Sequence, residues 1–98
     1  MHSCAYTSSV TFQWDRGKAR ANLRKHRVDF ADAATVFDDP SALTLDDTHP
    51  HEELFVTLGM DALGRVLVVC WSARADDFRI ISARRANRAE TRQYEEEP

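Results

Sequence analysis

The chain has 98 residues, 43% of them hydrophobic and 30% charged, which is the composition of one modest globular domain. Its longest apolar run, residues 66–71, is far shorter than the roughly 18 residues that a membrane span requires. The N-terminus lacks the basic and apolar segments of a signal peptide, so we expect a cytoplasmic protein. Cys4 and Cys70 lie in unlike surroundings, and no structural disulfide is predicted.

The net charge of −3 conceals a strong segregation of charge along the chain. Residues 16–27 carry six Lys and Arg and no acid, whereas residues 28–64 carry nine acids and no Lys or Arg. Residues 65–92 then carry seven arginines against three acids. Arginine outnumbers lysine by eleven to two, which favours bidentate contacts over diffuse charge. Such a distribution predicts a basic surface that attracts phosphate or acidic partners, although solvation is the better explanation for any single arginine.

A flexible lead-in is expected over residues 1–9, followed by a single domain over residues 10–96. Val10, Phe12 and Trp14 alternate with polar residues, which is the period of a half-buried strand. The domain is therefore predicted to begin with a strand.

A helix is predicted over residues 16–26, because Asp15 is a good N-cap and the segment contains no proline. Its arginines recur at spacings of four, four and three and form one stripe, which solvation explains about as well as binding does. A polar row and a presumed buried row occupy the other faces. The stripe is Arg16, Arg20, Arg24 and Arg27; the polar row is Lys18, Asn22 and Lys25; the buried row is Ala19, Leu23 and His26.

A second, short helix is expected between its N-cap Asp29 and Pro40, which ends it. Strands are then expected near residues 42–47, 54–58 and 65–72, separated by turns. The apolar run in the last of these predicts a central strand that is covered on both faces.

Residues 78–94 pass from a strand to a helix. Strict alternation places Phe78, Ile80, Ser82 and Arg84 on one face of the strand and Arg79, Ile81, Ala83 and Arg85 on the other. Asn87 and Glu90 form a capping-box pattern, so the last helix is predicted to begin at Arg88. The predicted fold is α+β: a mostly antiparallel sheet of about four strands plus an N-terminal strand, with two N-terminal helices and a C-terminal helix packed on one side.

Metal chemistry is not predicted. His49, His51, Glu52 and Glu53 lie close together, but no matching Cys or His pair accompanies them, and a polar loop explains the cluster. The three glycines are not grouped into a phosphate-binding loop, and no serine lies in a recognisable nucleophile turn. We therefore expect no metal and no other cofactor.

What remains is a surface rich in guanidinium groups, with possible proton carriers beside it. RNA can cut itself through its own 2′-hydroxyl when a protein supplies cations and one or two proton-transfer groups. The possible proton carriers are His26, Lys25, Lys18 and Tyr94.

Three blocks of sequence, in this order and at these intervals, together resemble the BrnT family of type II toxins. The blocks are VTFQWD from residue 10, KARANLRKHRVDFADAATVFDDP from residue 18, and RIISARRANRAETRQYEE from residue 79. The resemblance implies a RelE-like fold, metal-independent cleavage of RNA that stops translation, and neutralisation by a cognate BrnA-type antitoxin. It also implies an oligomeric toxin-antitoxin complex whose antitoxin part binds the operon's promoter DNA. Arg27 departs from the family pattern, which more often has glycine there.

The resemblance also implies residue roles. By analogy with RelE-like toxins, Arg79 and Arg84 stabilise charge on the scissile phosphate, with Arg65 as a third cation. Tyr94 is expected to stack on a base or to help position the 2′-hydroxyl. His26 and Lys25 are candidates for proton transfer. The expected RNA-binding residues are Lys18, Arg20, Asn22, Arg24, Arg85 and Arg88.

A second class of function needs the same arginines. The chain can instead be a catalytically inactive module that binds nucleic acid or an antitoxin within a repressor complex. Because cleavage and binding both use these cations, the alternative stays open at the level of sequence.

Overall fold

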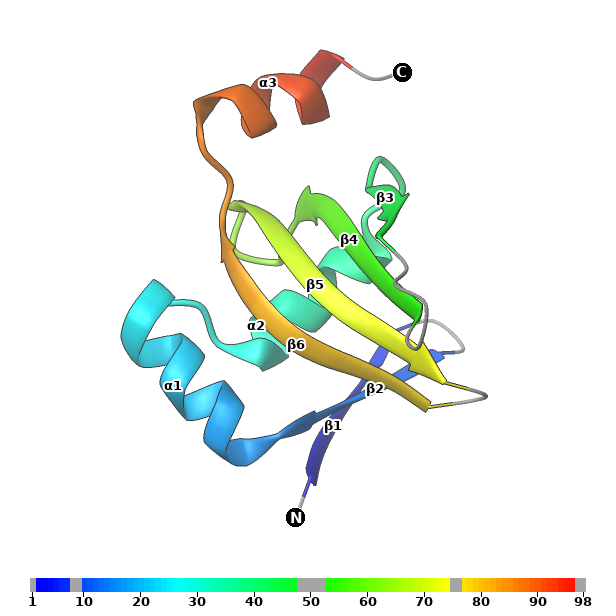
Figure 1. The fold of residues 1–98 in the computed structure, drawn as a ribbon. Helices are drawn as coiled ribbons and strands as arrows, with labels where there is room; N and C mark the ends of the chain where they lie inside the picture. Colours follow the sequence, from blue (N-terminus) through cyan, green and yellow to red (C-terminus); the bar gives the residue numbers. More distant parts are fainter. Residues whose placement is uncertain (1, 8–9, 48–52, 75–76, 97–98) are drawn as a thin grey trace.

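The structure is a computed structural model that describes residues 2–7, 10–47, 53–74 and 77–96. Strands, three α-helices and one short 3₁₀ helix make up the described part of the chain (Figure 1). In chain order the elements are β1 (His2–Thr7), β2 (Val10–Asp15), α1 (Arg16–His26), α2 (Phe30–Ala34), the 3₁₀ helix η1 (Thr35–Asp38), β3 (Leu43–Asp46), β4 (Glu53–Met60), β5 (Val66–Arg74), β6 (Asp77–Arg85) and α3 (Arg88–Glu96).

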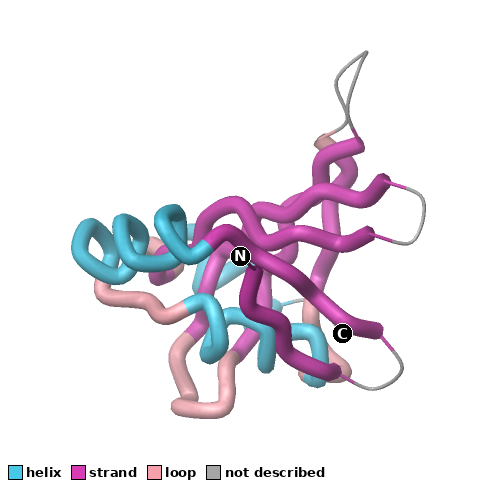
Figure 2. Tube along the Cα trace, turned by 90° about the horizontal axis from the view of Figure 1, so that it is seen from below, coloured by secondary structure: helices cyan, strands magenta, loops and turns pink. Residues whose placement is uncertain are grey.

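One six-stranded sheet contains all of these strands, in the order β1-β2-β6-β5-β4-β3. Neighbouring strands run antiparallel, except β2 and β6, which run parallel with Phe12 opposite Phe78. Figure 2 shows the strands as one curved layer with α1 beside it. The chain is therefore α+β with a mixed, mostly antiparallel sheet, and the five strands from Val10 onward match the predicted order.

Strand β1 differs from the expectation of a flexible lead-in over residues 1–9. It pairs with β2 along its whole length, from His2 opposite Asp15 to Thr7 opposite Val10. The segment HSCAYT has no strong apolar alternation of its own, so local pattern does not predict it. The segment forms a strand because it pairs with β2, since β-structure depends more on context than on propensity.

The helices begin where their caps predict. Asp15 accepts a hydrogen bond from the backbone N–H of Lys18 at 2.9 Å, and Asp29 accepts one from Ala31 at 2.9 Å. Helix α2 is short and continues as η1, which ends before Pro40. In the part of the chain that the structure describes, no helix has the length and apolarity to cross a membrane.

The hydrophobic core lies between one face of the sheet and the layer formed by α1, α2 and η1. Aromatic side chains from both layers meet in it, with Phe12 and Phe37 stacked at 4.0 Å between ring centroids. The largest fully buried side chains are Phe30, Leu67, Ile80, Val28, Val36, Val69 and Thr57.

Strand β6 contains a β-bulge that changes which residues share a face. Cys70 of β5 pairs with Ser82, but the next residue, Trp71, pairs with Ile80, so Ile81 has no partner of its own. The alternation of side chains therefore shifts by one residue at Ile81.

The predicted faces of β6 were wrong for this reason. Ile80 and Ala83 are both buried in the core, at 2% and 0% exposure, although strict alternation separates them. Ser82 and Arg84 face away from the core, and beyond the bulge so does Arg79, which pairs with Ser72. Arg79 and Arg84, which the sequence pattern places on opposite faces, thus share the open face of the sheet.

Helix α3 does not join the other helices, and the expectation that all three pack on one side was wrong. Glu90 and Gln93 of α3 line a small cavity of about 60 Å³ on the far face of the sheet. No residue of α3 is buried, so β5 has only partial cover on this face instead of the predicted full cover. The aliphatic side chains that line the cavity with α3 are Leu43, Leu45, Val56, Leu58 and Val68.

Candidate functional site

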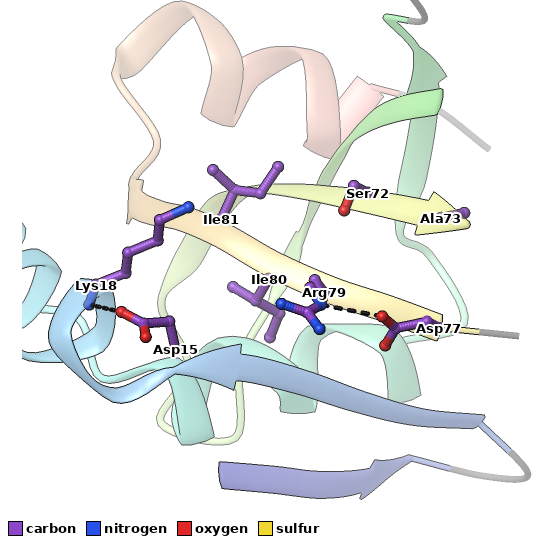
Figure 3. A pocket seen from close by; sticks show the side chains of 8 residues that line it. All are labelled: Asp15, Lys18, Ser72, Ala73, Asp77, Arg79, Ile80 and Ile81. Atoms are coloured by element: carbon purple, nitrogen blue, oxygen red, sulfur yellow. Dashed lines mark hydrogen bonds and ion pairs between the residues drawn. The ribbon is translucent and has the colours of Figure 1, made fainter. Parts of the chain in front are cut away.

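A hollow of about 320 Å³ opens between the start of α1, the end of β5 and the first half of β6 (Figure 3). Figure 3 shows Lys18 extending from α1 toward β6, with Arg79 and Asp77 on the strand facing it. Cations and carboxylates therefore meet at one position on the open side of the sheet. The lining residues are Asp15, Lys18, Ser72, Ala73, Asp77, Arg79, Ile80 and Ile81.

Arg79 is held in this hollow by its inner nitrogen. Its Nε donates to Oδ2 of Asp77 at 3.0 Å, and the side chain is 43% exposed. Among the described residues, its two terminal nitrogens have no hydrogen-bond partner. A guanidinium fixed at Nε with free terminal nitrogens is well arranged to bind a phosphate by two parallel hydrogen bonds.

Arg84 lies on the same face but is already paired. Its Nη1 and Nη2 donate to the two carboxylate oxygens of Glu90, each at 2.8 Å. Glu90 belongs to the predicted capping box, since it accepts from the N–H of Asn87 at 2.9 Å and donates its own N–H to Asn87 Oδ1 at 2.8 Å. The hydrogen bond with Glu90 raises the pKa of Arg84, and the same bond lowers the pKa of Glu90.

Tyr94 points to the loop after η1. Its hydroxyl donates to Oδ2 of Asp39 at 2.6 Å, and the same oxygen accepts from the N–H of Met60 at 2.9 Å. The hydrogen bond to Asp39 raises the pKa of Tyr94 to about 12, so the phenol is protonated at neutral pH. Burial raises the pKa of Asp39, but the hydrogen bonds from Tyr94, Met60 and Ser41 outweigh it and the pKa is lowered.

Asn22 connects α1 to β6 and was not predicted to do so. Its Nδ2 donates to the carbonyl oxygens of Ala83 at 2.7 Å and Val28 at 3.0 Å, and its Oδ1 accepts from the N–H of Ala83 at 3.1 Å. The side chain is buried, with its amide fully used by the protein backbone. The structure thus places Asn22 in the interior, where its amide joins α1 to β6.

The Lys and Arg residues of α1 fall into two groups around Asn22. With about 3.6 residues per turn, Lys18 and Lys25 project close to Asn22, on one side of it, whereas Arg20 and Arg24 project from the face of the helix opposite Asn22. The lysines face the open side of the sheet, as the position of Lys18 in the hollow shows. Arg20 and Arg24 are thus separated from the other predicted RNA contacts.

The buried row of α1 was predicted only in part. Ala19 packs against the core and His26 is half-buried in the last turn, but Leu23 is 45% exposed. Asn22 takes the inward position that the prediction gave to Leu23, because an amide at that position satisfies the backbone groups of Ala83.

Arg65 lies on the other face and was wrongly grouped with the sheet arginines. Its Nε donates to Oδ2 of Asp61 at 2.9 Å, and its Nη1 donates to the carbonyl of Arg27 at 3.3 Å. Its Nη2 lies 3.6 Å from Oδ2 of Asp32. Since it precedes the buried Leu67 by two residues in the strand direction, it points to the core side of the sheet. Its hydrogen bond to Asp61 therefore joins the two ends of the turn before β5.

Arg85 and Arg88 are exposed at the end of β6 and the start of α3. The residues that the structure describes contain no group of three or more metal-ligating side chains. The hypothesis of a metal site at His49 and His51 falls on residues 48–52, outside the described residues.

Residues 14–90 match the family model of the ribonuclease toxin BrnT of type II toxin-antitoxin systems. The chain belongs to the BrnT family. The resemblance carried by the three sequence blocks is thereby confirmed, together with the function of the family: a ribonuclease toxin that has an antitoxin as its counterpart.

A solved structure supports the BrnT fold. The crystal structure of the Brucella abortus ribonuclease toxin BrnT matches with a TM-score of 0.61 and 24% sequence identity. The match covers 76% of this chain and 94% of the Brucella toxin. A comparison with curated proteins finds no match. At this identity the likeness to the Brucella toxin is one of fold.

Proposed function

We propose that this BrnT chain is a cytoplasmic, metal-independent endoribonuclease that cleaves RNA on the open face of the sheet and so stops translation. The observation that carries the proposal is the bulge at Ile81, because it brings Arg79 and Arg84 to the same open face of the sheet, where Arg79 lines the hollow. Membership of a family of ribonuclease toxins supports the same reaction class.

The reaction uses the substrate's own 2′-hydroxyl. The 2′-oxygen attacks phosphorus as the bond from phosphorus to the 5′-oxygen breaks, which leaves a 2′,3′-cyclic phosphate and a free 5′-hydroxyl. The 2′ proton passes to a base, and the 5′-oxygen receives a proton from an acid. Positioned cations stabilise the extra negative charge of the phosphorane, each contributing about 10² to 10³ in rate.

Arg79 and Arg84 take different parts in this reaction. They are five positions apart along β6, a spacing of roughly 15 Å between Cα atoms. Each guanidinium is bound to its own carboxylate, Asp77 or Glu90, so the two do not share one phosphate in this arrangement. Arg79, with free terminal nitrogens, binds the scissile phosphate together with Lys18. Arg84, which Glu90 partly neutralises, binds a phosphate further along the RNA.

Proton transfer is assigned by position along α1. Lys18 lines the hollow with Arg79 and is the general acid of the proposal. Lys25 and His26 lie one turn beyond Asn22, toward Arg84, and serve as acid or base if cleavage occurs there. Tyr94 acts by stacking on a base, because its hydroxyl is protonated and donates to Asp39.

The partner of this toxin is proposed to be a BrnA-type antitoxin. It neutralises the toxin in an oligomeric complex, and its own DNA-binding part carries the complex to the operon promoter. The alternative function, an inactive module within such a repressor complex, is favoured by one observation: the ion pair with Glu90 occupies Arg84.

The experiment is cleavage of a long RNA by the purified chain, freed from any partner, in EDTA. We expect the wild type to cut and Arg79→Ala to cut at least about 10²-fold more slowly. Arg92→Ala, an exposed arginine on α3, is the matched control and should cut normally. If Arg79→Ala cuts at the wild-type rate, the hollow is not the active site; if chelation abolishes cutting by the wild type, the metal-independent mechanism is wrong.

A further inference from the structure

A second basic surface lies on the outer flank of α1, turned away from the hollow that contains Arg79. It is a shallow, open depression of about 590 Å³. We call it the outer α1 face. Its lining residues are Arg20, Leu23, Arg24 and Arg27.

The arginines of the outer α1 face have no acidic partners among the residues that the structure describes. Within the described residues, Arg65, Arg79 and Arg84 each form an ion pair, whereas Arg20, Arg24 and Arg27 form none. The segment from residue 16 to residue 27 contains no acid that can neutralise them along the helix. In the described part of the chain, three guanidinium groups around the outer α1 face are therefore uncompensated, although the sequence carries more acids than bases overall.

Leu23 lies in the middle of these arginines and is 45% exposed. A single exposed leucine is ordinary on a protein surface, but one surrounded by these arginines combines an apolar contact with anion-binding groups. A phosphate backbone makes no use of an aliphatic side chain. A protein segment that carries an apolar residue between carboxylates uses both.

Arg27 gives an independent indication that the surface is functional. It is the C-cap of α1 with φ of 61° and ψ of 30°, the left-handed conformation that glycine adopts more easily than any other residue. An arginine at such a position is strained, and strain of this kind accumulates where the side chain has a function. Here the side chain of Arg27 completes the wall of the depression.

We propose that the outer α1 face binds an acidic helix of a protein partner, with an apolar residue of that helix packed on Leu23 and its carboxylates paired with Arg20, Arg24 and Arg27. The three arginines span about 11 Å of α1 at 1.5 Å per residue, or two turns of a facing helix. Because this surface lies on the opposite flank from Lys18, binding there leaves the hollow open. The inference does not depend on the proposed cleavage activity.

The test is an NMR titration of the isotopically labelled chain with a synthetic helical peptide. The peptide carries a central leucine flanked by glutamates three and four residues away on each side, and a second peptide has serine in place of that leucine. We expect the first peptide to shift the amide signals of residues 19–27, and the serine peptide to bind several-fold more weakly. Leu23→Asp and Arg27→Glu should each weaken binding by about tenfold or more, which is the effect of a central contact.

Arg92→Glu is the control, because it makes the same charge change on exposed α3. Circular dichroism of each variant checks that the fold is kept, and RNA cleavage by Leu23→Asp should equal that of the wild type. A titration with a single-stranded RNA oligonucleotide tests the alternative that this surface binds nucleic acid. If the RNA shifts the signals of residues 19–27 and the peptide does not, the surface binds nucleic acid and the proposal is wrong. If neither does, the arginines merely solvate α1, and the proposal is equally overturned.

Discussion

Arg84 and Glu90 join the last strand to the last helix through two parallel hydrogen bonds of 2.8 Å. The same carboxylate accepts the N–H of Asn87, so one ionised side chain closes the capping box and fixes the guanidinium. Since α3 buries none of its residues, this pair and the bond from Tyr94 to Asp39 in the loop after η1 are the polar contacts that hold it to the rest of the domain in the described structure. The attachment of α3 therefore depends on the charge of Glu90.

We predict that the ion pair is lost in acid. The bond from Arg84 lowers the pKa of Glu90 below its ordinary value of 4.5. A carboxyl with a lowered folded pKa contributes stability above its unfolded pKa and loses it as the pH falls through the folded pKa. Asp39 also has a lowered pKa, so it adds to the same acid loss.

Thermal unfolding of the wild type and Glu90→Gln measures this effect. Glutamine keeps the capping box, so the difference isolates the ion pair, which should stabilise the wild type by about 1 kcal/mol or less at neutral pH because it is partly exposed. The difference should shrink as the pH falls below 4.5. An equal difference at neutral pH and in strong acid contradicts the assignment.

Substitutions at Lys18 and His26 show whether RNA is cleaved at the Arg79 end or at the Arg84 end of the open face. If the scissile phosphate binds at Arg79, Lys18→Met should slow cleavage by about 10² or more, because it removes both a cation and the proposed acid. His26→Gln should then have little effect, since His26 lies beyond Asn22 in α1. Single-turnover cleavage of a short RNA by both variants gives the comparison, and the reverse result moves the reaction to the Arg84 end.

Asn22→Ala should destabilise the fold strongly. The substitution leaves the N–H and C=O of Ala83 and the carbonyl of Val28 without their partner in a buried place. Each unsatisfied group costs about 1 to 3 kcal/mol, so losing all three partners should lower the free energy of unfolding by about 3 kcal/mol or more. Lys25→Ala, exposed on the same helix, is the control and should change stability by less than about 0.5 kcal/mol. Urea denaturation measures both.

Tyr94→Phe tests the contribution of the Tyr94 hydroxyl while keeping the aromatic ring. Removing the hydroxyl deletes the bond to Asp39 and should cost about 1 kcal/mol of stability, with cleavage nearly unchanged because the phenol is not the base. Tyr94→Ala should also weaken RNA binding if the ring stacks on a base, by about 1 to 3 kcal/mol. Loss of cleavage in the phenylalanine variant, with its fold intact, contradicts the stacking role.

Local signals in the sequence predicted local structure well. Asp15, Asp29 and the pair of Asn87 with Glu90 cap their helices as their spacing indicates, because a cap depends on three or four neighbouring residues. The apolar alternation of residues 10–14 likewise predicted β2. The family resemblance supplied the reaction class, which these signals alone leave open.

What the sequence did not predict depends on distant partners. The bulge at Ile81 is a shift in the register between β5 and β6, and the sequence of β6 alone does not predict it. Asn22 is a core residue because Ala83, 61 positions away, offers its backbone groups. Arg65 carries the same charge as Arg79, but it lies on the core side of the sheet, where Asp61, Asp32 and the carbonyl of Arg27 surround it.

Arg27→Gly should stabilise the chain while weakening any ligand of the outer α1 face. Glycine adopts the left-handed conformation of residue 27 without the strain of a side chain, so the free energy of unfolding should rise by about 0.5 to 1 kcal/mol. Arg27→Ala is the matched control, because alanine has the same backbone strain and also lacks the guanidinium. We expect the alanine variant to be about as stable as the wild type and to bind the acidic peptide as weakly as the glycine variant does. If glycine does not stabilise the chain, the conformation of Arg27 is not strained; if both variants bind the peptide normally, the arginine is not part of the binding surface.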